Sequence, residues 1–436
     1  MNTNKSLGLK ELIAIATGGM VGGGIFTILG ISVSMVGFLA PFAIALGGVI
    51  ALFAAYAYVK LGVYYQDEGA TYAFFKRTYP DSHLAAAFIG WYTIFGYIST
   101  LALYAYTFSS YSISGSEFAH NEWVRKGVAI MIIWTFAMIN LWSIKGMGKL
   151  EDIMVYAKLT ILFVISMLLI YFTKINFNTF SETLINDLDQ TKSIHILIVA
   201  SVTFVAYEGF QLVINAAKEM DDPEKNIPRA IYSSVVLVAI IYFIISLGSV
   251  LAIPVENLIQ NKEYALASGV EDIMGPFGRD LVIIGAVLAT SSAISGTMFG
   301  SSRQMARIAD DRYLPYILSK RNGTIPIYAI ITMAATASIL ILIGGLRLIL
   351  EFGSITFLLV SLLMAIANFK IRYLTHSSTL MGIITITGLG IGSTLILWYE
   401  YQTKPKQMIF IIIIYIILSI SAWSYAHIAS KKAFKF

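Results

Sequence analysis

Hydrophobic residues of this 436-residue chain gather into long runs that short polar connections separate. A helix that crosses a membrane needs about 20 mostly apolar residues, and that window finds twelve runs. They lie at about 11–33, 38–63, 84–110, 125–143, 148–172, 194–216, 230–253, 280–303, 325–346, 352–369, 379–400 and 407–428. No period-two alternation is seen in them, so the pattern predicts an all-α polytopic membrane protein.

The polar connections predict one domain and a topology. The longest of them, about 173–193 and 254–279, are too short for a separate soluble domain, so we expect a single domain over 1–436. If the spans alternate in direction, most of the 30 lysines and arginines lie on the side of the N-terminus. Basic residues favour the cytoplasmic side, and we therefore expect a cell-membrane protein with both termini in the cytoplasm.

Composition excludes several function classes. The chain is 57% hydrophobic and 13% charged, with a mean hydropathy of +0.76, which indicates a lipid bilayer as its surroundings. The net charge of +5 comes from short loops and forms no basic stripe, so we expect no nucleic-acid partner. There is no cysteine, and the five histidines show no ligand spacing. We expect no metal and no disulfide.

Two ionisable residues lie deep inside apolar runs. Lys158 is in the fifth run and Glu208 is in the sixth. A charged group near the bilayer centre costs roughly 2.5–3.5 kcal/mol on insertion scales, and such groups usually mark ion or substrate paths. Lys158 could instead extend its amine to the nearer membrane surface. Glu208 could instead be a protonated carboxyl that serves packing.

The first run contains the stretch TGGMVGGGIF, from Thr17 to Phe26. Glycine weakens a helix by roughly 1 kcal/mol per residue relative to alanine. Small residues at a spacing of four suit close helix packing, but Gly22, Gly23 and Gly24 are consecutive and face three directions. They permit an unwound turn whose N–H groups, together with the dipole of the half helix that follows, would bind a carboxylate.

The sixth and eighth runs carry further polar groups. The stretch AYEGF, from Ala206 to Phe210, interrupts the sixth run with a carboxylate and a glycine. Two interrupted helices five spans apart are typical of inverted repeats with a site at their interface. The eighth run supplies hydroxyls that can line a pathway or pack against neighbouring helices; they belong to Thr290, Ser291, Ser292, Ser295 and Thr297.

Three stretches resemble signature regions of the amino acid permeases of the amino acid-polyamine-organocation superfamily. They are GGMVGGGIF in the first run, KEMDDPEKNIPRAI at 218–231 and SSRQMARIADDRYLP at 301–315. The resemblance covers about residues 8–375 in the same order. The fifth run, with Glu151 seven residues before Lys158, is most similar to prokaryotic proton-coupled amino acid transporters of broad specificity.

The resemblance implies a LeuT-like fold of five plus five inverted helices. Spans 1–5 would cover about 11–172, spans 6–10 about 194–369 and two accessory spans about 379–428. The first and sixth spans would be unwound in the middle of the membrane. Such transporters bind a small amino acid or amine between these two spans.

The resemblance also implies site residues. The substrate carboxylate would meet the amides of Gly22, Gly23 and Gly24, and the ammonium would meet carbonyls around Thr17, Gly18, Gly19, Phe204, Val205 and Ala206. An aromatic gate would map to Phe204, Tyr207 or Phe210. Lys158 would take the place that sodium has in related symporters, near the carbonyls of Gly18 and Val21 and the hydroxyls of Ser291 and Ser292. The coupling ion would then be a proton, with no other cofactor.

Glu208 departs from the resemblance, because small or apolar residues are common at that position. Its charge would favour cationic amino acids or amines as substrates. From the resemblance and the place of Lys158, we expect a secondary active, proton-coupled transporter that works by alternating access. An exchanger without net proton coupling is the first alternative. A sensor that does not transport is a second, although only eight residues follow 428. No enzyme motif is identifiable.

Overall fold

The computed structural model describes residues 7–67, 69–142, 145–173, 177–217 and 219–433. Within these residues the protein is helical, apart from two isolated β-bridges. The longer helices that follow the first apolar run are α3 (Ala40–Tyr65), α5 (His83–Ile113), α6 (Glu122–Trp142), α7 (Lys145–Tyr171), α11 (Pro223–Ala252), α13 (Ala265–Asp310), α14 (Ile327–Ile343), α15 (Leu346–Lys370), α16 (Thr379–Thr403) and α17 (Pro405–Ala433).

The first apolar run forms two helices instead of one. Helix α1 (Leu9–Met20) ends before the consecutive glycines, and α2 (Gly24–Val36) begins at the last of them. Residues 21–23 between them are not helical, as expected where glycine removes the local preference for a helix. A 3-10 turn (Gly37–Leu39) then joins α2 to α3.

The sixth run is also interrupted. It consists of α9 (Ser193–Val202), the 3-10 segment η2 (Thr203–Tyr207), a non-helical stretch and the single turn α10 (Leu212–Asn215). Glu208 stands in extended backbone directly after η2, and Gly209 follows with φ +130°. Only glycine adopts that φ without strain, so Gly209 is the residue that allows the helix to break here.

Short helical segments occupy several of the polar connections between the apolar runs. They are α4 (Ala70–Thr78), α8 (Phe177–Gln190), α12 (Val255–Gln260) and the 3-10 turn η3 (Tyr316–Ser319). The eighth run proves to be part of a longer helix, since α13 starts at Ala265 and bends at Gly275, whose φ is +69°.

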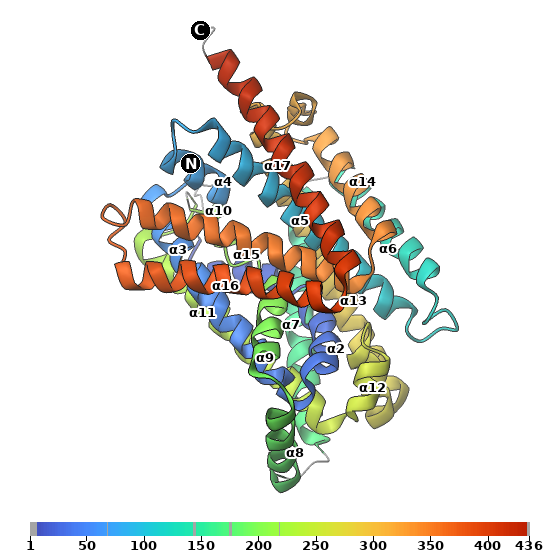
Figure 1. Ribbon diagram of the computed structural model, residues 1–436. Coiled ribbons are helices and arrows are strands. Elements are labelled where there is room, and N and C mark those ends of the chain that lie inside the picture. The colour runs from blue at the N-terminus through green and yellow to red at the C-terminus, as the bar shows by residue number, and fades with distance from the viewer. Residues whose placement is uncertain (1–6, 68, 143–144, 174–176, 218, 434–436) are drawn as a thin grey trace.

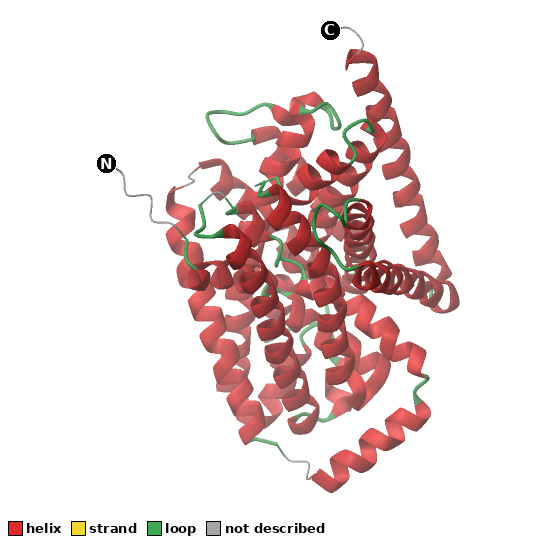
Figure 2. Cartoon of the chain, turned by 90° about the vertical axis from the view of Figure 1, so that its left-hand side faces the viewer, coloured by secondary structure: helices red, strands yellow, loops and turns green. Residues whose placement is uncertain are grey.

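The long helices pack into one bundle around α5, which contacts α6, α13, α14, α15 and α17. Helix α11 lies along α3 and α1, and the two views show α8 at one end of the molecule (Figures 1 and 2). The C-terminal end of α17 lies toward the opposite end in Figure 1.

Ten helices in the described part of the chain are long and apolar enough to cross a membrane, by length and composition. Ile327–Ile343 is a shorter apolar helix, and α2 is counted together with α3. The protein is therefore an all-helical, polytopic membrane protein. The count of twelve spans and the inverted repeat stay predictions.

Candidate functional site

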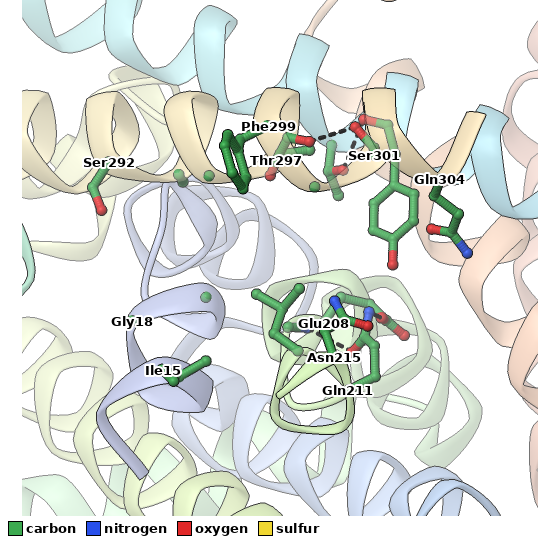
Figure 3. A pocket seen from close by; sticks show the side chains of 18 of the residues that line it. Ile15, Gly18, Glu208, Gln211, Asn215, Ser292, Thr297, Phe299, Ser301 and Gln304 are labelled. Carbon is green, nitrogen blue, oxygen red and sulfur yellow. Dashed lines mark hydrogen bonds between the residues drawn. The ribbon is translucent and has the colours of Figure 1, made fainter. Parts of the chain in front are cut away.

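A cavity of about 830 Å³ lies where the two interrupted runs meet α5 and α13. Gly18 and Gly19 line it from α1, and Glu208 and Gln211 line it from the break in the sixth run. Figure 3 shows the residues of α13, from Ser292 to Gln304, along the facing wall. This volume is in the range of sites for small molecules.

The cavity has a buried base and an exposed mouth. Glu208, Tyr104 and Ser292 at the base are at most 4% exposed. Glu11 and Arg307, which also line the cavity, are exposed to solvent. Glu11 is on the first turn of α1 and Arg307 is in the last turn of α13. The cavity therefore opens at the end of the bundle where the described chain begins.

The carboxyl of Glu208 is fixed on one side and free on the other. Gln211 Nε2 donates to Glu208 Oε2 at 2.8 Å, and Gln211 Oε1 accepts from the Gly209 amide at 3.0 Å. Oε1 of Glu208 is buried and has no partner among the described residues. Buried polar atoms are normally paired, so this oxygen is placed to receive a donor from a ligand in the cavity.

Lys158 lies behind the cavity wall, fully buried on α7. Its Nζ donates to the carbonyl of Gly18 at 2.7 Å and lies 3.4 Å from the hydroxyl of Ser292. The side chain thus reaches inward to α1 and α13 and does not extend to a membrane surface. The side chain of Glu151 lies outside the described part of the structure.

The break between α1 and α2 keeps free amides at the start of α2. The Val21 amide donates to Thr17 O at 2.8 Å, and the Gly22 amide donates to Met20 O at 2.9 Å. The first N–H groups of a helix have no acceptor within it, and this holds for the turn that begins at Gly24. The hydroxyl of Thr17 is buried without a partner among the described residues.

The two breaks touch each other. A Cβ on Gly209 would lie 2.5 Å from the carbonyl carbon of Gly19, so only glycine allows this approach of backbone to backbone. A Cβ on Gly24 would lie 2.7 Å from the Cβ of Ala206 in η2. The buried hydroxyl of Tyr242 on α11 lies 3.0 Å from Met20 O and 3.2 Å from Ala206 O. One tyrosine therefore joins both breaks.

The predicted site residues divide into two groups. Gly18, Gly19, Glu208 and Ser292 line the cavity. The others pack around it in this conformation; they are Thr17, Val21, Gly22, Gly23, Gly24, Lys158, Phe204, Val205, Ala206, Tyr207, Phe210 and Ser291.

The three aromatic residues predicted as a gate are all fully buried in helix packing. The Tyr207 hydroxyl donates to Ile44 O at 2.7 Å, and the ring of Phe210 meets the edge of Tyr58 with centroids 5.4 Å apart. Phe204 does not line the cavity in this conformation either.

Several lining residues were missed from the sequence. Tyr97 and Tyr104 stand seven residues apart on α5, with Thr100 between them, and so share one face of the helix. The seven-residue spacing of the two tyrosines could have indicated this face of α5 from the sequence. The amides of Asn215 and Gln304 also line the cavity, and nothing in their local sequence sets them apart.

A bundle of long apolar helices around a cavity with a polar base defines a multi-pass membrane protein with a site for a small molecule. The chain belongs to the amino acid permease family, whose model matches residues 7–419. This covers nearly the whole chain and confirms the resemblance seen in the three signature stretches.

Relatives span most of the chain. The protein is 28% identical to the inner membrane transport protein YbaT of Escherichia coli, over 92% of both chains. It is 24% identical to the human Asc-type amino acid transporter 1, over 88% of this chain and 71% of that one. It is 23% identical to the chloroplastic cationic amino acid transporter 7 of Arabidopsis thaliana, over 86% and 67%.

Proposed function

We propose that the protein is a secondary active amino acid transporter that works by alternating access and couples uptake to protons. The observation that carries the proposal is the cavity at which two interrupted helices meet, with Glu208 at its base and Lys158 behind its wall. Membership of the amino acid permease family supports amino acids as the substrate class.

In this proposal the twelve runs are membrane spans in two inverted sets of five with two accessory spans. Helices α1 and α2 form the first span, α9 to α10 form the sixth, and both are broken near the midplane. With both termini in the cytoplasm of a cell membrane, the mouth beside Glu11 and Arg307 faces inward. The conformation is then the inward-facing state of the transport cycle.

The substrate is proposed to bind across the two breaks. Its carboxylate would meet the amides around Gly22 to Gly24, where α2 begins, because a helix N-terminus favours an anion. The Gly22 amide, which donates to Met20 O in this conformation, would exchange that acceptor for the carboxylate. Its ammonium would meet carbonyls around Thr17 to Gly19 and Phe204 to Ala206. A positively charged side chain or amine would meet the free oxygen of Glu208.

Lys158 is proposed as the coupling group. Its charged form ties α7 to the carbonyl of Gly18, and its neutral form would weaken that bond and let α1 move relative to α7. In proteoliposomes, Lys158→Ala should abolish amino acid uptake driven by a pH gradient while substrate still binds. Uptake at the wild-type rate with the same dependence on the gradient would contradict the coupling role.

The same assay separates symport from exchange. An exchanger shows counterflow of labelled amino acid against unlabelled amino acid without a pH gradient, whereas a symporter concentrates substrate only when protons flow. Counterflow together with the absence of gradient-driven uptake in the wild type would assign the exchanger.

Glu208 is proposed to select cationic amino acids or amines, and the name of the Arabidopsis relative supports that class. A hydrogen bond to a charged group contributes roughly 1.5–3 kcal/mol, so Glu208→Gln should weaken arginine or lysine binding by about tenfold or more. Alanine binding should change little. Glu11→Gln at the exposed mouth is the matched control. An equal loss for all substrates would assign Glu208 a structural role.

A further inference from the structure

Two carboxyl groups lie buried together on α15 and α16, away from the cavity. Glu351 is in the second turn of α15, Glu400 is in the last turn of α16, and neither is exposed to solvent. Neither residue lines the cavity. The other end of α15 carries Lys370, which donates to the carbonyl of Thr78, the last residue of α4. The pair of carboxyl groups is therefore separate from the cavity.

One cation stands directly against the two acids. Arg347 Nε lies 2.6 Å from Glu351 Oε1, and Arg347 Nη2 lies 3.8 Å from Glu400 Oε1, which is too far for a hydrogen bond. Both oxygens of Glu400 and Oε2 of Glu351 have no hydrogen-bond partner among the described residues. Three buried carboxyl oxygens at one place thus lack a donor.

A proton would supply the missing donor. Both carboxyls lie against the guanidinium of Arg347, and two carboxylates can only accept. Two like charges in one buried place also disfavour full ionisation. We propose that Glu351 and Glu400 form a proton-binding site in which one carboxyl is protonated and donates to the other. Arg347 then balances the single charge that remains.

A metal ion fits this place less well than a proton. The guanidinium of Arg347 already lies against the carboxyl oxygens, and it would repel a second cation. Hard metal ions also require six or more oxygen ligands, whereas two carboxyl groups offer four oxygens. A proton needs no further ligand.

Among the described residues, no neighbouring charged group donates a hydrogen bond to the three unpaired carboxyl oxygens. Lys404 follows α16, and burial and the nearby Arg347 lower the pKa of its amine. No ion pair joins Lys404 to either carboxyl in the described structure. The positive charge of Lys262 lowers the pKa of the Lys404 amine further. The ring of Tyr399 lies 5.2 Å from Arg347 Cζ and 6.2 Å from the ring of His195 on α9.

The site joins an outer helix of the bundle to a helix that touches the break in the sixth run. One turn after Glu351, the hydroxyl of Ser354 donates to the carbonyl of Val202, and Gly353 faces Val205 of η2. A bound proton would therefore stabilise the contact between α15 and α16 next to η2. This inference does not depend on the coupling role of Lys158.

The test measures the thermal unfolding midpoint of the purified, detergent-solubilised protein from mildly acidic to mildly alkaline pH. At near-neutral pH the folded protein holds a proton on this carboxyl pair, whereas free glutamates of the unfolded chain, with a pKa of about 4.3, have already lost theirs. The free energy of unfolding must therefore fall as pH rises. Glu400→Gln keeps a donor at the same place without a titratable group, and it should flatten this fall. Glu182→Gln on the exposed face of α8 removes the same charge and should leave the fall unchanged.

Infrared spectroscopy gives a second readout. The C=O stretching band of a protonated carboxyl should be present in the wild type and reduced in Glu400→Gln. Glu351→Gln removes the other member of the pair and serves in the same way if Glu400→Gln does not fold. The proposal is overturned if a folded variant of either kind keeps both the wild-type pH dependence and the full carboxyl band.

Discussion

Lys158 shows how one proton can change several contacts at once. An ammonium offers three donors, and in this structure they reach Gly18 on α1 and Ser292 on α13. In the proposed coupling step, loss of the proton would weaken both bonds together. It would then alter how α7 is held to two elements of the cavity wall.

Tyr242 is the residue that joins the two breaks, and its hydroxyl should matter for substrate affinity. Tyr242→Phe keeps the ring but removes this donor, and because Met20 O still accepts from the Gly22 amide, the carbonyl of Ala206 is the one that loses its bond. An unpaired buried polar group costs about 1–3 kcal/mol. We expect a lower thermal midpoint and a changed Kd for amino acids, both measured on purified protein.

A matched control separates the two effects. Tyr111 is also fully buried, and its hydroxyl donates at 2.9 Å to the carbonyl of Phe26, which belongs to α2 alone and not to the sixth run. Tyr111→Phe should lower the midpoint without changing substrate affinity. Equal changes in affinity for both variants would show that Tyr242 acts only through stability.

At the scale of elements, the start of α2 packs against η2 with no room for a side chain. Gly24→Ala would place a methyl group 2.7 Å from the Cβ of Ala206, and overpacking typically costs about 1–3 kcal/mol. We expect a lower thermal midpoint and slower transport. Gly127→Ala on α6, where no atom lies within 4 Å of the new Cβ, should be neutral or stabilising. A neutral Gly24→Ala would mean that the breaks move apart easily.

The elements also show what a sequence can and cannot tell. The apolar runs and the break at Gly22 to Gly24 were predictable, because length, hydropathy and consecutive glycines act locally. The bond from Gln211 to Glu208 and the place of Tyr242 between two breaks depend on packing and were not. Helix α8 was missed because its 14 residues lie in a polar connection, which a search for apolar runs passes over.

For the whole molecule, the cavity has its mouth beside Glu11 and Arg307, and because the sequence holds no cysteine, single introduced cysteines can report on its accessibility. Thr297 lines the cavity, whereas Thr107 is fully buried. In membranes, Thr297→Cys should react with a polar maleimide added from the cytoplasmic side. Thr107→Cys should stay unreactive in this state. Labelling of Thr297→Cys solely from the opposite side would reverse the proposed orientation.

The contact between Gly19 and Gly209 has a mechanical consequence. Because backbone meets backbone there with no side chain between, neither segment can slide past the other without a collision. A shift of α1 toward the sixth run would therefore press directly on the backbone at Gly209. The displacement would reach the second break without passing through any ligand.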